Sequence, residues 1–333
     1  MSNSHRSRRP DGFTLIELMI VVSLLGIIGT MLTTLLVRQQ RFHRAVTNIT
    51  DARARMRDVA TIIPTDLRSI STAGGDILAI TDTSMQFRAF IGASVLCNYA
   101  TTTVIELPPR VLAPTAAINT ATKVSTVLTS WINPPAPDDI AYLYNHGTKE
   151  GNVDDQWNPV RITDTTSTTN ATWCPATNVP AYTTADDNGA RRYRITLATA
   201  PDQAQVGIGA PIRFAREVRY SLYVATDGQW YVGYQRCVPH ATYGQLGTCG
   251  DREVLAGPVL PATGDASTAG LGFQYFKKDG TAITTVTAAD TIARIQVGIR
   301  TTSESLLKAT TKIGGSITGG DSLKFTVGIR NRI

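Results

Sequence analysis

One carboxylate stands alone in the first apolar stretch of the chain. The run from Phe13 to Val37 contains Glu17 as its only charged residue. A charge in the middle of a membrane-length helix costs about 2.5 kcal/mol or more, so a carboxylate in such a run needs a partner or a function. A carboxylate and an ammonium that are both held in hydrocarbon each lower the other's cost. Glu17 is therefore the first candidate functional residue.

Four cysteines follow the apolar run, at Cys97, Cys174, Cys237 and Cys249. None belongs to a Cys-x-x-Cys pair, which argues against a zinc site, and an even number of cysteines without metal-ligand spacing is typical of disulfide-bonded domains that face the periplasm or the cell exterior. Three pairings are possible. We favour Cys237 with Cys249, because they follow one strand and flank a glycine-rich loop, and by elimination Cys97 with Cys174. The alternative is four free, buried thiols in a reduced domain.

No constellation typical of catalysis, of a cofactor or of a metal site is predicted. The histidines beyond the first few residues lack a neighbouring nucleophile or metal-ligand spacing, and no phosphate-binding loop is found. Three acidic pairs could offer oxygen ligands to calcium, at 138–139, 154–155 and 186–187. None matches an EF-hand loop, so we interpret them as solvated turns.

The residues around Glu17 form a specific motif. From Gly12 to Glu17 the chain reads Gly-Phe-Thr-Leu-Ile-Glu behind a short basic stretch. This resembles the prepilin cleavage site of type IV pilins and type II secretion pseudopilins. The resemblance implies that a membrane-embedded prepilin peptidase cuts between Gly12 and Phe13 and that the new amine on Phe13 is methylated. It also implies that Glu17 pairs with the amine of a neighbouring subunit in a filament. Pro10 and Asp11, next to the glycine, depart from many family leaders.

Two other interpretations explain this segment less well. A secretory signal peptide has an apolar stretch of about 7–15 residues closed by small residues, whereas this run is longer and is not closed that way. A plain transmembrane anchor needs about 20 apolar residues, which Phe13 to Val37 satisfies. Such an anchor leaves Glu17 and the Gly12-Phe13 junction unexplained.

Arginines flank the apolar run on both sides, at positions 6, 8 and 9 and at positions 38, 41 and 44. By the positive-inside rule, the cytoplasmic flank of a membrane helix carries the excess of arginine and lysine. The arginines on the two sides of this run do not by their number place the amino terminus in the cytoplasm. The first helix usually dominates topology, however, and the cysteines indicate an oxidising compartment. We therefore expect a single-pass protein of the bacterial inner membrane, with its large domain in the periplasm or on the cell surface.

The apolar periodicity continues past the membrane segment. Apolar residues recur every seven positions, at Leu35, Phe42, Ile49, Met56 and Ile63. This spacing predicts the stripe of an amphipathic helix, packed on a sheet rather than in a coiled coil. Because proline cannot continue a helix, we predict one helix from 13 to 63 that ends at Pro64. Residues 13–37 are its transmembrane part and 38–64 its amphipathic continuation.

The remaining chain alternates between apolar and polar residues, which predicts strands. The candidates are 85–91, 140–144, 193–197, 218–224, 230–232, 271–276, 282–287, 295–299 and 323–329. Asp227-Gly228 and Asp279-Gly280 predict hairpins with type I′ turns. Residues 163–190 and 133–137 are expected to be loops. The predicted fold is α+β, with the long helix packed on one antiparallel β domain over 65–333.

Length favours one branch of the family. Removing the 12-residue leader from 333 residues leaves 321, which is longer than most major pilins. Phe273 to Phe276 and Ile295 to Ile299 resemble the ending of minor pilins of the PilW type, and the GspJ pseudopilin has a similar ending, so length favours the minor pilin. The resemblance implies a non-enzymatic structural subunit or assembly-priming factor of a type IV pilus, found at a filament tip. Its implied partners are other pilin subunits, a prepilin peptidase and methyltransferase, an inner-membrane assembly platform and membrane lipid.

Two alternatives remain open. One is a GspJ-like pseudopilin of a type II secretion system, and the other is a membrane-anchored adhesin or DNA-uptake receptor. The formal net charge of +6 suits acidic lipid headgroups or neighbouring subunits. Nucleic acid would require basic residues clustered in a stripe, and the arginines here are dispersed.

Overall fold

The computed structural model describes most of the chain. The described residues are 14–71, 75–108, 128–131, 133–149, 151–169, 172–174, 192–284, 291–301 and 322–329. Contacts group Ala54–Thr302 with Gly320–Ile333 in one compact unit, so about the last four turns of the helix belong to the β domain.

The helix α1 extends from Leu15 to Arg68. The prediction that it ends at Pro64 is therefore wrong. A proline inside a helix costs about 3 kcal/mol, because it removes a backbone hydrogen bond and its ring crowds the preceding turn. Here the next turn places Leu67 in the core, and Ile70 beyond the helix is also fully buried. Burying two such side chains contributes about 1.5–3 kcal/mol each, which offsets the cost of the proline.

The apolar stripe is buried in only part of the helix. Met56, Val59 and Ile63 are buried, whereas Phe42 is 61% exposed and Val46 is 42% exposed. The stripe therefore packs against the β domain from Met56 onward, whereas Phe42 and Val46 earlier in the stripe are exposed.

The strands range in length from two residues in β3 to 14 residues in β9. They are β1 (Ile77–Ile80), β2 (Ser84–Val95), β3 (Asn98–Tyr99), β4 (Val104–Leu107), β5 (Ser130–Trp131), β6 (Ile140–Asn145), β7 (Gln156–Thr168), β8 (Arg192–Leu197), β9 (Pro211–Val224), β10 (Trp230–Val238), β11 (Thr248–Cys249), β12 (Glu253–Val259), β13 (Leu271–Phe276), β14 (Ala282–Ile283), β15 (Arg294–Arg300) and β16 (Ser322–Gly328).

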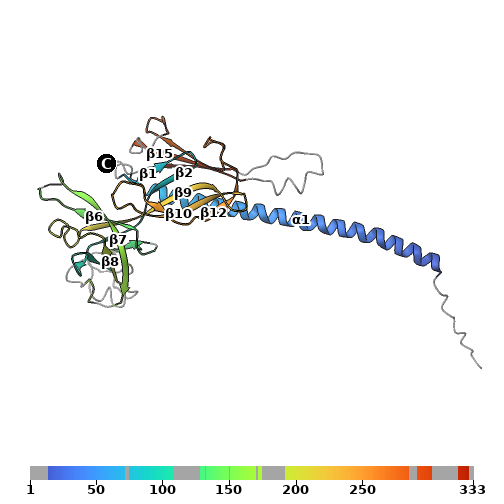
Figure 1. Ribbon diagram of the computed structural model, residues 1–333, viewed down its shortest axis with the longest axis horizontal. Coiled ribbons are helices and arrows are strands. Elements are labelled where there is room, and N and C mark those ends of the chain that lie inside the picture. The colour runs from blue at the N-terminus through green and yellow to red at the C-terminus, as the bar shows by residue number, and fades with distance from the viewer. Residues whose placement is uncertain are drawn as a thin grey trace, which may run out of the picture. The chain divides into compact units, whose positions relative to one another are not determined.

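Two antiparallel sheets are formed from these strands (Figure 1). The larger has 12 strands, with a main path in the order β1-β2-β9-β6-β7-β8-β4-β3. Strand β10 pairs with β9, β11 and β12, while β5 pairs with β2. The smaller sheet has four strands in the order β14-β13-β15-β16. The long strand β9 organises the larger sheet, because it pairs with β2, β6 and β10 along different parts of its length.

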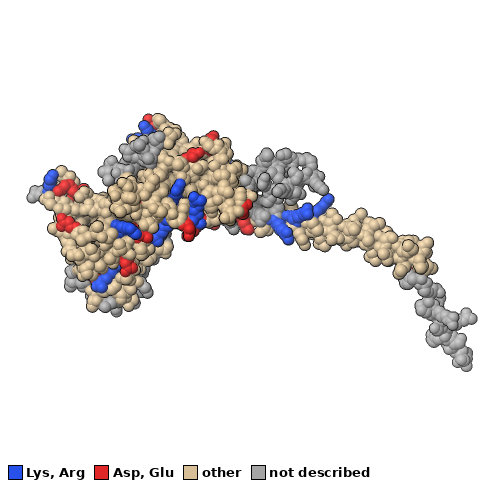
Figure 2. Space-filling model, in the orientation of Figure 1, with Lys and Arg blue, Asp and Glu red and all other residues tan. Residues whose placement is uncertain are grey.

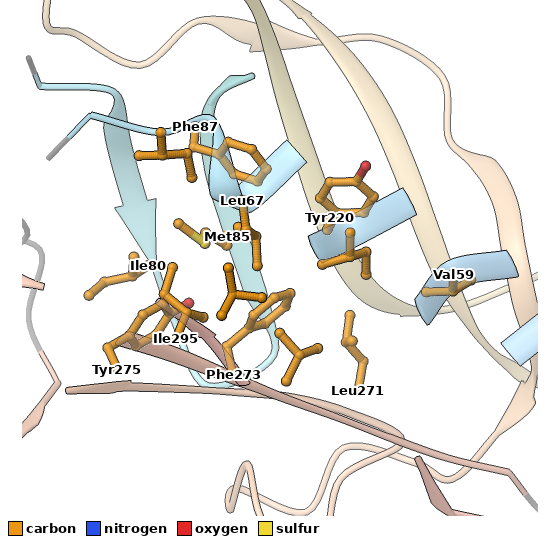
Figure 3. Close-up of a cluster of buried hydrophobic side chains, with 14 of the residues drawn as sticks. Val59, Leu67, Ile80, Met85, Phe87, Tyr220, Leu271, Phe273, Tyr275 and Ile295 are labelled. Carbon is orange, nitrogen blue, oxygen red and sulfur yellow. The ribbon is translucent and has the colours of Figure 1, made fainter. Parts of the chain in front are cut away.

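The main core lies where α1 and the two sheets meet. Figure 3 shows side chains of α1, β2, β9 and β13 converging in this cluster of buried residues. Phe87 on β2 stacks on Tyr220 of β9 with ring centroids 5.9 Å apart, and Phe273 on β13 is 2% exposed. A helix that buries one stripe against a sheet in this way gains more stability from packing than from its own propensity.

Buried side chains of β4, β6, β7, β8 and β9 form a second core. At its centre Trp131 packs edge-on against Tyr193 and Phe214, with ring centroids 5.0 Å and 5.7 Å away. This cluster supports the part of the larger sheet that is formed by β4, β6, β7, β8 and the first half of β9.

The structure confirms the predicted α+β fold and its antiparallel strands. It corrects one loop, because β7 extends to Thr168 into the stretch from residue 163 that was expected to be irregular. Threonine-rich sequence suits a strand as well as a loop, and pairing with β8 settles the choice. Most of the rest of that predicted loop lies outside the described residues.

Both predicted hairpins form, but with a different turn. A type I′ turn requires positive φ at both central residues. Asp227 does not have it, whereas Gly228 has a φ of 77° and its N–H donates to the carbonyl of Ala225, 3.0 Å away. This is a type I turn followed by a left-handed glycine, and Asp227 accepts a hydrogen bond from the Gln229 N–H (2.9 Å). Residues 277–281 repeat the arrangement around Gly280.

One hydrogen bond joins the end of α1 to β9 and supports a prediction. The Tyr220 hydroxyl donates to Asp66 Oδ2 at 2.6 Å in a buried setting, and burial raises the pKa of Asp66. Tyr220→Phe should lower the free energy of unfolding at neutral pH by about 2 kcal/mol, because the carboxylate loses its donor. The deficit should shrink as pH falls through the raised pKa of Asp66, since the neutral carboxyl needs the donor less. Urea unfolding at several pH values measures both effects.

Tyr223→Phe is the matched control on the same strand. Tyr223 is half-buried, and no partner of its hydroxyl is found among the described residues. The free energy of unfolding of the Tyr223→Phe variant should stay within about 0.5 kcal/mol of the wild-type value at every pH. Equal losses for the two variants would contradict the role of the Asp66 hydrogen bond.

Candidate functional site

The candidate site is the start of α1, where Thr14 caps the helix. The Thr14 hydroxyl accepts a hydrogen bond from the Glu17 N–H at 3.4 Å, and the Thr14 carbonyl accepts one from the Leu18 N–H at 3.2 Å. A threonine three residues before a glutamate is the capping-box sequence. Sequence reasoning overlooked this role of Thr14, although that spacing was the available signal. Gly12 and Phe13 lie outside the described residues.

The segment that follows has the composition of a membrane span. Leu15–Arg44 is long and apolar enough to cross a membrane, and its large apolar side chains are exposed. Its hydroxyl groups are satisfied within the helix. They bond to carbonyls one turn earlier, at 2.8 Å from Ser23 to Met19 and 2.7 Å from Thr34 to Thr30. A span that satisfies its own polar groups can enter lipid without leaving donors unpaired.

Glu17 is the exception in this segment. Its side chain is exposed, and among the described residues its carboxylate has no hydrogen-bonding or ion-pair partner. Capping uses the backbone of Glu17 and leaves the carboxylate available. In hydrocarbon such a group needs a cation supplied by another chain or by a terminus.

Arginines mark the far end of the span. Arg38, Arg41 and Arg44 are exposed on the helix, and Figure 2 shows basic side chains where the uncharged surface of the helix ends. Long cationic side chains at such a position reach toward lipid headgroups while their stems remain in the apolar region.

The four cysteines form two disulfides. Cys237 on β10 is bonded to Cys249 on β11, where the two residues are direct register partners. Cys97 is bonded to Cys174 across 77 residues, and both are fully buried. These are the two pairs that the sequence favoured.

A buried carboxylate positions the second disulfide. Glu106 on β4 is 1% exposed and accepts a hydrogen bond from the Cys174 N–H at 2.7 Å. Arg194 on β8 donates two hydrogen bonds to Glu106 Oε1, at 2.9 and 2.7 Å. The disulfide thus attaches the segment around Cys174 to a sheet that is already held by a charge-assisted pair.

The acidic pairs have partners within the protein. Asp139 is fully buried rather than solvated, because Arg216 donates to both of its oxygens at 2.8 Å and Arg236 donates to Oδ1 at 3.0 Å. Asp154 accepts hydrogen bonds from the N–H groups of Thr148 and Lys149, which hold its pKa below the usual range. The pair at 186–187 lies outside the described residues. Within the described part of the chain, no group of three or more His, Cys, Asp or Glu side chains could hold a metal ion.

The comparisons agree with the geometry at the start of α1. The family model described as the prokaryotic N-terminal methylation motif matches residues 7–33. Neither a curated protein nor a solved structure matches the chain. The match covers the capped helix start, Glu17 and most of the apolar span, and it implies processing by a prepilin peptidase and assembly with other pilins. The chain therefore carries the amino-terminal motif of the type IV pilin and pseudopilin family.

Proposed function

We propose that the protein is a minor pilin, a structural subunit that helps to prime assembly of a type IV pilus. The observation that carries the proposal is the methylation motif at residues 7–33 on a helix whose only span carboxylate, Glu17, has no partner among the described residues. A subunit with this arrangement supplies a carboxylate and needs an ammonium, and a second copy or a related subunit offers one at its processed terminus.

Length favours the minor pilin over the GspJ-like pseudopilin, because the ending of the chain resembles both. The two segments whose sequence resembles minor pilins of the PilW type fall on neighbouring strands β13 and β15, where Gln274 is the register partner of Gln296. They form the centre of the four-stranded sheet that covers the end of α1. In this proposal the sheet carries the surface by which the subunit fits beside its neighbours, and the large domain faces the periplasm or the cell exterior.

Processing gives the direct test of the proposal. Protein purified from its native host should begin at methylated Phe13, because the peptidase that recognises this motif cuts after Gly12. Mass spectrometry of the amino-terminal peptide measures this. An intact Met1, or a cut beyond Val37, would contradict the assignment to a processed pilin.

Location separates the two branches of the family. A minor pilin should be found in sheared pilus preparations, and deleting it should reduce the number of pili while secretion of exported enzymes continues. The opposite pattern, with normal pili and failed secretion, would favour the pseudopilin. The methylated terminus is expected in both cases.

A further inference from the structure

A pocket of about 290 Å³ opens in the β domain, far along the chain from the amino-terminal motif. Residues from four strands and two connecting segments line it. Arg88 on β2, Arg213 on β9 and Asp76 before β1 supply charge, and Phe90, Tyr142, Trp157 and Tyr243 supply aromatic rings. Its volume is at the lower limit of small-molecule sites and suits one ring of six atoms with substituents.

Among the described residues, neither arginine of the pocket has a carboxylate partner at ion-pair distance. Elsewhere in the described chain, Arg194 and Arg216 pair with carboxylates at 2.7 and 2.8 Å. Arg88 and Arg213 make no such pair, although Asp76 lines the same pocket. A pocket with two guanidinium groups and one carboxylate carries a net charge of about +1 and favours an anion.

Arg88 has an unused donor at this site. Its side chain is 2% exposed, its Nη1 donates to the Gly75 carbonyl at 3.2 Å, and its guanidinium lies 4.2 Å from the centroid of the Tyr243 ring. Its Nε is buried and has no hydrogen-bond partner. A buried N–H without an acceptor is destabilising, so the Arg88 guanidinium keeps hydrogen-bonding capacity that the described residues do not use.

Arg213 faces aromatic rings rather than acids. Its guanidinium lies 5.6 Å from the Phe90 ring centroid and 5.7 Å from that of Trp157. Stacking on aromatic faces leaves the edge of a guanidinium free to bind a planar carboxylate. Phe90 is 39% exposed and Tyr243 is 44% exposed, so neither residue is fully covered by the protein.

Asp76 and Tyr142 supply the remaining polar groups. Asp76 is 7% exposed and accepts hydrogen bonds from the Ser71 N–H at 2.7 Å and from the Tyr142 hydroxyl at 3.3 Å. Burial raises the pKa of Asp76, while the Ser71 N–H and the two arginines act in the opposite direction. A carboxylate has about four acceptor positions, so Asp76 can still accept hydrogen bonds from ligand hydroxyls.

These three features together select a ligand class. Guanidinium groups bind a carboxylate, aromatic faces pack on the C–H face of a saturated ring, and an aspartate accepts from hydroxyls. We propose that this pocket binds an acidic sugar of the uronic-acid type, with Arg88 and Arg213 on its carboxylate and Asp76 on its ring hydroxyls. The proposal goes beyond an assembly role, because it gives the exported domain a carbohydrate ligand of its own.

The test compares three matched ligands on the full chain in detergent micelles by isothermal titration calorimetry. D-galacturonate has both the carboxylate and the hydroxyls, D-galactose lacks the carboxylate, and cyclohexanecarboxylate lacks the hydroxyls. Galacturonate should bind at least about tenfold more tightly than either of the others, the loss expected for one missing charge-assisted contact. Equal or tighter binding of galactose, or of cyclohexanecarboxylate, would overturn the proposal, as would no binding of galacturonate.

A pair of variants tests the residues themselves. Arg213→Gln should weaken galacturonate binding about tenfold or more and leave galactose binding unchanged. Arg161→Gln is the matched control, because Arg161 pairs with Asp138 and does not line the pocket. An affinity that does not change in Arg213→Gln would overturn the proposal. If that variant fails to fold, the comparison of the three ligands on the unchanged chain still decides it.

Discussion

Replacing Glu17 by alanine should reduce incorporation of the chain into filaments by about 100-fold or more. Removing one partner of an ion pair that is buried in hydrocarbon costs about 3–5 kcal/mol, because the other charge is left without compensation. Glu17 is exposed and unpaired among the described residues of the isolated chain, so the loss should appear only when subunits assemble. Quantitative blotting of sheared filaments, with wild-type partner subunits present, measures incorporation.

Two controls separate assembly from folding. Ser23→Ala also replaces a polar side chain of the span by alanine, but the Ser23 hydroxyl already bonds to the Met19 carbonyl of its own helix. It should be incorporated normally. The Glu17→Ala protein should keep the melting temperature of the wild-type chain in detergent, because Glu17 is exposed and its carboxylate has no partner among the described residues. Normal incorporation of Glu17→Ala would refute the proposed role.

Removing the Cys97–Cys174 disulfide should destabilise the β domain more than removing the Cys237–Cys249 disulfide. In the chain-entropy model, a loop of 77 residues closed by Cys97 and Cys174 stabilises the fold by about 4.5 kcal/mol. The bond between Cys237 and Cys249 closes a loop of only 12 residues and contributes about 3 kcal/mol. Urea unfolding of the two double alanine variants should therefore show the larger loss for the first pair.

The two pairs serve as controls for each other, because each variant removes two sulfur atoms and differs mainly in the loop that it opens. Peptide mapping under non-reducing conditions should recover both cross-linked peptide pairs from natively exported protein. Four alkylatable thiols would contradict both disulfides and, with them, the argument that the β domain lies in an oxidising compartment.

Much of the architecture could be predicted from local sequence. The apolar run with one carboxylate is a property of consecutive residues, so the span and the family motif could be recognised without a fold. Alternation over five or more residues predicted β15 and the second half of β9. The long strand β7 was missed, because its sequence is rich in polar residues and threonine. Short strands such as β4 were missed, since four residues give too little periodicity to stand out.

The structure overturned the interpretation of one local signal, the acidic pair at 138–139. The acidic pair at 138–139 has the composition of a solvated turn, yet Asp139 is buried between Arg216 and Arg236. The two partners lie on β9 and β10, more than 70 residues along the chain. The residues near Asp139 in the sequence do not indicate these two arginine partners, because an ion pair depends on distance in space and not on distance along the chain.

By itself, the sequence determined the membrane helix, the processing motif with Glu17, and the antiparallel nature of the β domain. These follow from side-chain type and from periodicity over a few consecutive residues, which can be read from the sequence without knowledge of the fold. Only the tertiary structure decided that α1 continues past Pro64, that its stripe is buried from Met56 onward, and that Arg88 and Arg213 share a pocket with Asp76. Each of these outcomes depends on side chains of strands that are distant in the sequence. At Pro64, the free energy gained by burying apolar side chains against those strands offsets the cost of a proline inside a helix.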